Sequence, residues 1–201
     1  NIYMTTGHGE TAITELGLLS QMLSDMNYDV RSYDILSASI SLNPRTDLLL
    51  MVSPKADLEE NEFETVMEFM EAGGKMMIFL DRASFNVYQG KLQRFQTELP
   101  LINTLMEAYG ISVSSNIIYS DDITGINLRR SSIKVGNCYT DDTVIVSEAA
   151  EIDHSETADI TYRVLLETSD SCIALETDVR LETTSFDENE NRVFTVGIAA
   201  Q

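Results

Sequence analysis

The segment Gly7-His8-Gly9-Glu10 contains the side chains of this chain that are best suited to bind a ligand or to transfer a proton. It follows a strand-like stretch and precedes a helical pattern, which places it where a strand of a parallel sheet would turn into a helix. Ligands of open parallel sheets bind at that carboxyl edge. Asp34 and Asp81 also lie near the C-terminal ends of predicted strands, so we expect them to converge with His8 and Glu10. Such a cluster could bind a small ligand or a cation, or could exchange protons.

A purely structural interpretation competes with this hypothesis. Two glycines suit a tight turn, and Glu10 would lie favourably at the N-terminus of the following helix. The segment is not the G-x-G-x-x-G pattern of dinucleotide sites, and no P-loop lysine follows it. The candidate ligand-binding residues are therefore Gly7, His8, Gly9, Glu10 and Asp81, and we expect neither a metal nor a cofactor.

The sequence offers no arrangement that is typical of covalent catalysis. It has no G-x-S-x-G elbow. Ser53 ends a predicted strand, but Pro54 follows it and no histidine lies near it in the sequence. Cys138 and Cys172 lie in the second half, far from His8, and whether they form a disulfide stays open. We predict no catalytic residues and no enzyme; a hydrolase or amidotransferase-like activity is the least favoured alternative.

The charge of the chain limits its partners. The 201 residues include 13 basic and 33 acidic side chains, a formal net charge of -20. Nucleic-acid binding depends on Lys and Arg, so this balance excludes it as the main role. The chain shows neither a signal peptide nor an apolar run of the roughly 20 residues that a membrane span needs. Because it lacks an initiator Met, we expect it to be a soluble piece of a longer protein.

The first half alternates strand and helix patterns, which predicts an α/β core with a parallel sheet over residues 1–120. Apolar runs indicate the strands, and i, i+3, i+4 stripes indicate the helices. Asp57 is a plausible N-cap for the helix that begins near Leu58. The predicted strands are residues 1–6, 28–35, 47–53, 75–80 and 111–119, and the predicted helices are residues 12–26, 58–72 and 102–109.

The second half, residues 121–201, is predicted to be a β-rich extension of short strands. Its last apolar run, residues 194–200, is expected to return to the core sheet. Residues 82–100 form an irregular insertion, suited to a lid or a contact loop. Arg129 and Arg130 are expected in an exposed loop, and residues 187–191 at a hairpin tip. The predicted strands are residues 132–135, 143–147, 160–166, 172–175 and 193–199.

Five segments, in this order and spacing, give the chain a family resemblance. They are Thr6–Glu10, Asp47–Lys55, Gly73–Asp81, Leu105–Ile111 and Val164–Asp170. Together they resemble the extracytoplasmic domain of gliding-motility-type auxiliary components of ABC transporters, an uncharacterised ABC-type transport system family. The resemblance covers roughly residues 1–200 and is best up to Ile111.

The resemblance implies a flavodoxin-like parallel sheet, similar to class I glutamine amidotransferases but without their catalytic machinery. It implies a non-catalytic interaction domain at the extracytoplasmic face of the cell membrane, anchored through helices absent from this chain. The expected partners are an ABC permease of the ABC-2 export type and other transporter subunits. A small-molecule or glycan-binding module at the carboxyl edge of the sheet is the alternative.

Overall fold

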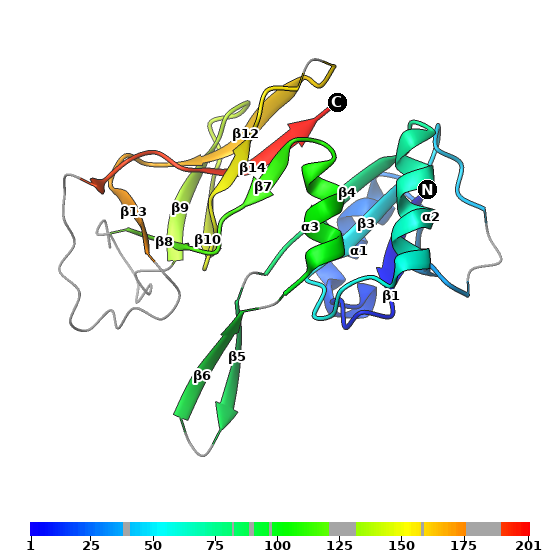
Figure 1. Ribbon diagram of the computed structural model, residues 1–201, viewed down its shortest axis with the longest axis horizontal. Coiled ribbons are helices and arrows are strands. Elements are labelled where there is room, and N and C mark those ends of the chain that lie inside the picture. Colours follow the sequence, from blue (N-terminus) through cyan, green and yellow to red (C-terminus); the bar gives the residue numbers. More distant parts are fainter. Residues whose placement is uncertain are drawn as a thin grey trace. The chain divides into compact units, whose positions relative to one another are not determined.

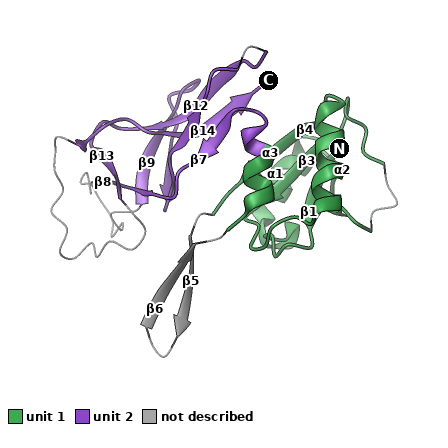
Figure 2. Ribbon diagram, viewed as in Figure 1, with its two compact units in different colours: residues 1–81, 97–105 green, residues 82–96, 106–201 purple. Residues whose placement is uncertain are grey.

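The computed structural model divides the chain into two compact units (Figure 2). Unit 1 comprises residues 1–81 and 97–105, and unit 2 comprises residues 82–96 and 106–201. The structure describes residues 1–37, 41–81, 83–88, 91–96, 98–120, 132–157, 159–175 and 190–201, with the backbone alone for 83–88 and 91–96. A boundary at residue 120 between core and extension stays a prediction.

Unit 1 is built on a four-stranded parallel sheet in the order β2-β1-β3-β4. Helices α2 and α3 lie in front of this sheet and α1 lies behind it (Figure 1). The apolar run of β3 is buried because it has a neighbouring strand on each side and helices over both faces. The elements are β1 (Ile2–Thr6), a 3-10 turn (Ile13–Glu15), α1 (Gly17–Asp25), β2 (Val30–Asp34), β3 (Leu48–Val52), α2 (Glu60–Glu71), β4 (Lys75–Phe79) and α3 (Pro100–Glu107).

Alternating side chains of the strands give this sheet its two packed faces. Ile2, Met4 and Leu50 form one buried cluster, against which Leu16 and Leu23 pack from the α1 side. Leu49 and Met51 point to the opposite face and are almost fully buried. Four predicted strands and the parallel sheet are thus confirmed, while the helix predicted over 12–26 begins only at Gly17, after the 3-10 turn.

The fifth predicted core strand, residues 111–119, is wrong. Ile111–Val113 (β7) and Ile117–Ser120 (β8) are separate strands, divided by a turn in which Ser114 Oγ accepts the Asn116 amide at 3.0 Å. Each pairs antiparallel within unit 2, β7 with β11 and β8 with β13. The parallel sheet therefore ends at β4.

Unit 2 is antiparallel throughout its described strand pairs. Its largest sheet has the order β10-β9-β12-β14. Strands β5 and β6 pair antiparallel, which corrects the prediction that residues 82–100 form an irregular insertion. The strands are β5 (Ala83–Tyr88), β6 (Lys91–Gln96), β9 (Ser132–Asn137), β10 (Thr143–Ser147), β11 (Ile152–His154), β12 (Tyr162–Thr168), β13 (Cys172–Leu175) and β14 (Thr195–Ala200).

The last strand does not return to the core sheet, which corrects the expectation for residues 194–200. β14 pairs antiparallel with β12 instead, and the adjoining Phe194 is buried with Ile118, Ile133 and Val135 in the core of unit 2. Cys172 belongs to the same cluster, whereas Cys138 is exposed, and both cysteines are free thiols. Arg129, Arg130 and residues 187–189 lie outside the described residues.

Asp57 caps a different helix from the one that the sequence predicts. Its carboxylate accepts the amides of Leu101 (2.7 Å) and Ile102 (3.1 Å) in the first turn of α3. Glu59 occupies the N-cap position of α2. Pro100 begins α3 and has no amide to satisfy, so Asp57 satisfies the next two amides from more than 40 residues away in sequence.

Replacing this cap should weaken unit 1 measurably. Asp57→Ala leaves two amides of α3 without their acceptor, and we expect it to lower the free energy of unfolding by about 1 kcal/mol, within the range of N-cap deletions. Urea denaturation followed by helical circular dichroism checks this. Asp57→Asn keeps one acceptor and should lose less; equal losses would contradict the capping role.

Candidate functional site

The loop that carries His8 leaves β1 through two glycines in left-handed conformations. Gly7 has φ +118° and Gly9 has φ +70°, values that a residue with a Cβ adopts only with strain. Between them the backbone carbonyl of His8 accepts the amides of Lys55 (2.8 Å) and Ala56 (3.0 Å). The glycines therefore serve a tight turn that joins the loop after β1 to the loop after β3.

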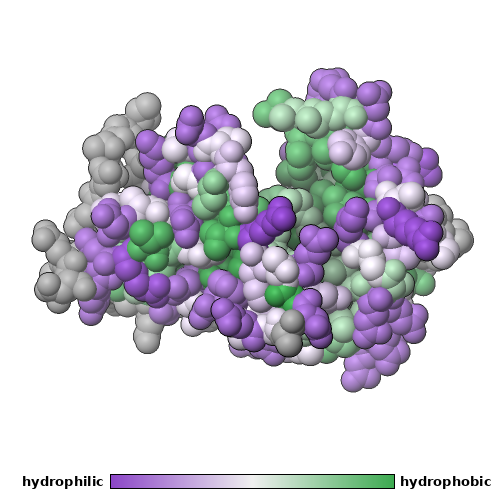
Figure 3. Space-filling view, turned by 90° about the horizontal axis from the view of Figure 1, so that it is seen from above, coloured by the Kyte–Doolittle hydropathy of each residue, from purple (hydrophilic) through white to green (hydrophobic). Residues whose placement is uncertain are grey.

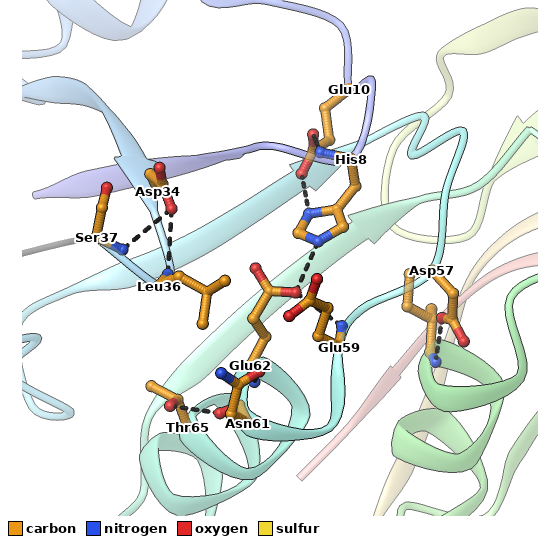
Figure 4. Close-up of polar contacts among 11 residues, drawn as sticks. His8, Glu10, Asp34, Leu36, Ser37, Asp57, Glu59, Asn61, Glu62 and Thr65 are labelled. Atoms are coloured by element: carbon orange, nitrogen blue, oxygen red, sulfur yellow. Dashed lines mark hydrogen bonds and ion pairs between the residues drawn. The ribbon is translucent and has the colours of Figure 1, made fainter.

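The His8 ring lies buried between two carboxylates (Figure 4). Its Nε2 is 2.8 Å from Glu62 Oε2, and its Nδ1 is 3.5 Å from Glu10 Oε1. The other oxygen of Glu10 accepts the His8 amide at 2.7 Å. The contact of Nε2 with Glu62 is a hydrogen bond, whereas His8 Nδ1 and Glu10 Oε1 are buried without a hydrogen-bond partner among the described residues. Only 7% of the His8 surface is exposed, so the ring is closed off from solvent.

Glu62 completes the cluster, and the sequence analysis missed it. It lies in the first turn of α2, and its Oε2 also accepts the Glu59 amide at 2.7 Å. A signal was present in the sequence. Glu62 shares the helical spacing i, i+4, i+7 with Val66 and Phe69, both of which are buried, so an acid stands on the buried face of the helix.

A second polar cluster lies at the end of β3. Ser53 has φ +55°, a strained value for a residue other than glycine. Its hydroxyl donates to Asp81 Oδ2 and accepts from Lys55 Nζ at 2.5 Å. Lys55 Nζ is also 3.0 Å from Asp81 Oδ2. Lys55 and Asp81 are about half exposed, so this cluster, unlike the one at His8, is open to solvent.

The surroundings of Ser53 do not suit it as a nucleophile. Its own amide donates to the Phe79 carbonyl at 2.8 Å, and Pro54 has no amide. Neither of the two nearest backbone nitrogens can therefore stabilise an oxyanion at this position. The cluster places an amine, a hydroxyl and a carboxylate together, which is an arrangement for hydrogen bonding to a polar group.

The four predicted residues do not form one cluster. His8 and Glu10 contact each other, Asp81 joins Ser53 and Lys55, and Asp34 accepts the amides of Leu36 (3.1 Å) and Ser37 in its own turn. Hydrogen bonds from Ser37 hold the pKa of Asp34 below its usual value. In the part of the chain that the structure describes, no group of three or more His, Cys, Asp or Glu could hold a metal ion.

Asp81 should make the stability of unit 1 depend on acid pH. Burial alone would raise its pKa, but hydrogen bonds from Ser53 and Lys55 and the Lys55 charge together hold it below the ordinary 3.8. The ionised carboxylate therefore stabilises the fold above about pH 4, and this contribution is lost as the pH falls further. We expect urea midpoints of Asp81→Asn to fall less steeply between about pH 5 and pH 3 than those of the wild type.

The family model for an ABC-type uncharacterized transport system matches residues 1–133, about two thirds of the chain. The chain belongs to this family. The match confirms the family resemblance found in the sequence, and it spans both polar clusters, from Gly7 to Asp81. No curated protein matches the chain.

A solved structure described as "mmIFT52 N-terminal domain" shares the fold of this family member. The two superpose with a TM-score of 0.60 at 15% sequence identity, over 85% of this chain and 74% of the other. At that identity the likeness concerns the mixed α/β fold alone. None of the helices in the described ranges has the length and apolar character that crossing a membrane requires.

Proposed function

We propose that this chain is a non-catalytic interaction domain of an auxiliary subunit of an ABC-2 export-type transporter. The family match over residues 1–133 carries the proposal, because that family is a transport system. The domain would lie at the extracytoplasmic face of the membrane, as in gliding-motility-type relatives, and would contact the permease and other subunits. The net charge of -20 favours protein partners over nucleic acid or anionic lipid.

The fold assignment within this proposal is a shortened flavodoxin-like sheet, similar to that of class I glutamine amidotransferases. The strand order β2-β1-β3-β4 supports it, since flavodoxin-like sheets run 2-1-3-4-5. At the end of β3 the Ser53 amide is bonded to the Phe79 carbonyl, and the next residue, Pro54, has no amide. The lack of a free amide at these two positions favours a role without covalent catalysis by Ser53.

Co-purification tests the partner part of the proposal. The full-length gene product, tagged and extracted from its own membranes, should bring down an ATPase and a permease of the transporter. A parallel preparation from cells that lack the tagged gene gives the background. Recovery of the protein without either subunit would overturn the proposed function.

The exposed Cys138 gives a direct test of location. A membrane-impermeant maleimide should label it in intact spheroplasts, while the buried Cys172 stays unlabelled until the protein unfolds. Cys138→Ser removes the signal and serves as control. Labelling only after lysis would place the domain on the other side of the membrane.

The alternative is a small-molecule or glycan-binding module at Gly7–Glu10 and Asp81. The half-exposed side chains of Lys55 and Asp81, beside the buried Ser53, favour it, because an amine and a carboxylate can donate to and accept from a sugar hydroxyl. Millimolar glucose, galactose or N-acetylglucosamine should then raise the melting temperature of the wild type but not of Asp81→Ala. Equal melting curves with and without sugar would exclude binding of these sugars.

A further inference from the structure

Strand β10 forms one edge of the largest sheet in unit 2. Five residue pairs join it to β9, and among the described strands it has no partner on its other side. An edge strand presents unpaired amides and carbonyls to which another strand can add. The edge at β10 is therefore a potential docking site.

This edge lacks the features that usually block pairing. Thr143–Ser147 contains no charge and no proline, and two β-branched side chains on opposite faces are exposed, Val144 at 48% and Ile145 at 56%. Edge strands are normally protected by charged side chains, prolines or bulges. In unit 1 the edge strand β2 carries Arg31 and Asp34 and so is protected in this way. Figure 3 shows, for one face of the molecule, how hydrophobic residues (green) and hydrophilic residues (purple) share the surface.

We propose that β10 binds an extended segment of a partner protein, which adds to the sheet as a further strand and carries basic residues beside Asp141 and Asp142. These two acids lie in the turn that leads into β10. Main-chain hydrogen bonds to the edge would supply affinity, and alternate side chains of the incoming strand would lie beside Val144 on one face and Ile145 on the other.

Charge argues against a second copy of this chain as the added strand. Each copy carries a net charge of -20, so two copies repel each other at long range. A basic segment of another protein does not meet this obstacle.

This inference rests on the proposed interaction role and names the chemistry of one partner. Its first test uses peptides with the intact chain. A peptide of alternating valine and threonine with lysines at both ends should bind, and hydrogen exchange of the β10 amides should slow. The same peptide with glutamates at both ends should bind on the order of tenfold more weakly. A central proline in the lysine peptide, which removes one amide, should weaken binding as well. Equal binding of all three peptides, or of none, would overturn the inference.

A charged substitution on the edge provides the second test. Ile145→Lys should abolish binding of the lysine peptide, because it places a charge on the docking strand. Val193→Lys makes the same change at another exposed apolar residue, 46% exposed and outside the strands, and should leave binding intact. Self-association of the wild type that Ile145→Lys removes would instead assign the edge to a second copy.

The two proposals fail in different ways. If Ile145→Lys co-purifies with the ATPase and permease as the wild type does and the peptides do not bind, the inference about β10 fails while the interaction role stands. If the lysine peptide binds β10 but the full-length protein brings down no transporter subunit, the docking edge stands and the proposed function fails.

Discussion

His8→Ala should lower the free energy of unfolding by about 1–3 kcal/mol, because it leaves the buried Glu62 Oε2 without its hydrogen bond to the His8 ring. The substitution leaves the carboxylates of Glu10 and Glu62 buried beside each other without the ring that separates them. Urea denaturation followed by far-ultraviolet circular dichroism measures the loss, because this signal reports on the described helices of unit 1 and the described strands of both units.

The other histidine of the chain supplies the matched control. His154 is exposed and its ring packs on Tyr162 at 4.6 Å between centroids. His154→Ala should change the unfolding free energy by less than about 1 kcal/mol, as is usual for surface substitutions. Similar losses for the two variants would mean that the buried hydrogen bond between His8 and Glu62 does not hold the loop after β1 to α2.

The elements of unit 1 were predictable because their sequence patterns are local. The run Leu48–Val52 is apolar at every position, which suits a strand between two neighbours with helices on both faces. The acids before Phe63 mark the beginning of α2, and the pair Gly73-Gly74 marks its end. The partners of β7, β8 and β14 were not predictable, because a short strand shows its own pattern but not which strand it will pair with.

The candidate site was predictable only in part, for a similar reason. The position of His8 after β1 follows from the strand pattern, but its ring partner Glu62 lies 54 residues away in the chain. An acid in the first turn of a helix is ordinary, so its burial has to be inferred from the spacing to Val66 and Phe69. Asp57 caps α3 across a comparable separation, and nothing in its neighbourhood distinguishes that role from capping α2.

Phe194→Ala should be the most damaging single change in unit 2, with an expected loss of about 3–5 kcal/mol, as for other buried aromatic truncations. The side chain is 1% exposed and packs in one cluster with Ile118, Ile133 and Val135. The Arg192 guanidinium covers the ring at 4.1 Å from its centroid, and the Phe194 amide donates to Thr168 Oγ1 at 2.9 Å. Substitution therefore opens a cavity where β14 begins.

Hydrogen exchange of β9 and β12 amides can measure this loss directly, because both strands lie in the sheet that β14 completes. Exchange should accelerate in Phe194→Ala by two to four orders of magnitude. This follows from the expected loss of about 3–5 kcal/mol, since about 1.4 kcal/mol corresponds to a tenfold change in the exchange rate. The adjacent Val193→Ala removes apolar atoms from a side chain that is 46% exposed, so it should leave exchange near the wild-type rate. Equal acceleration in both variants would show that the β14 backbone, rather than the Phe194 ring, holds this sheet together.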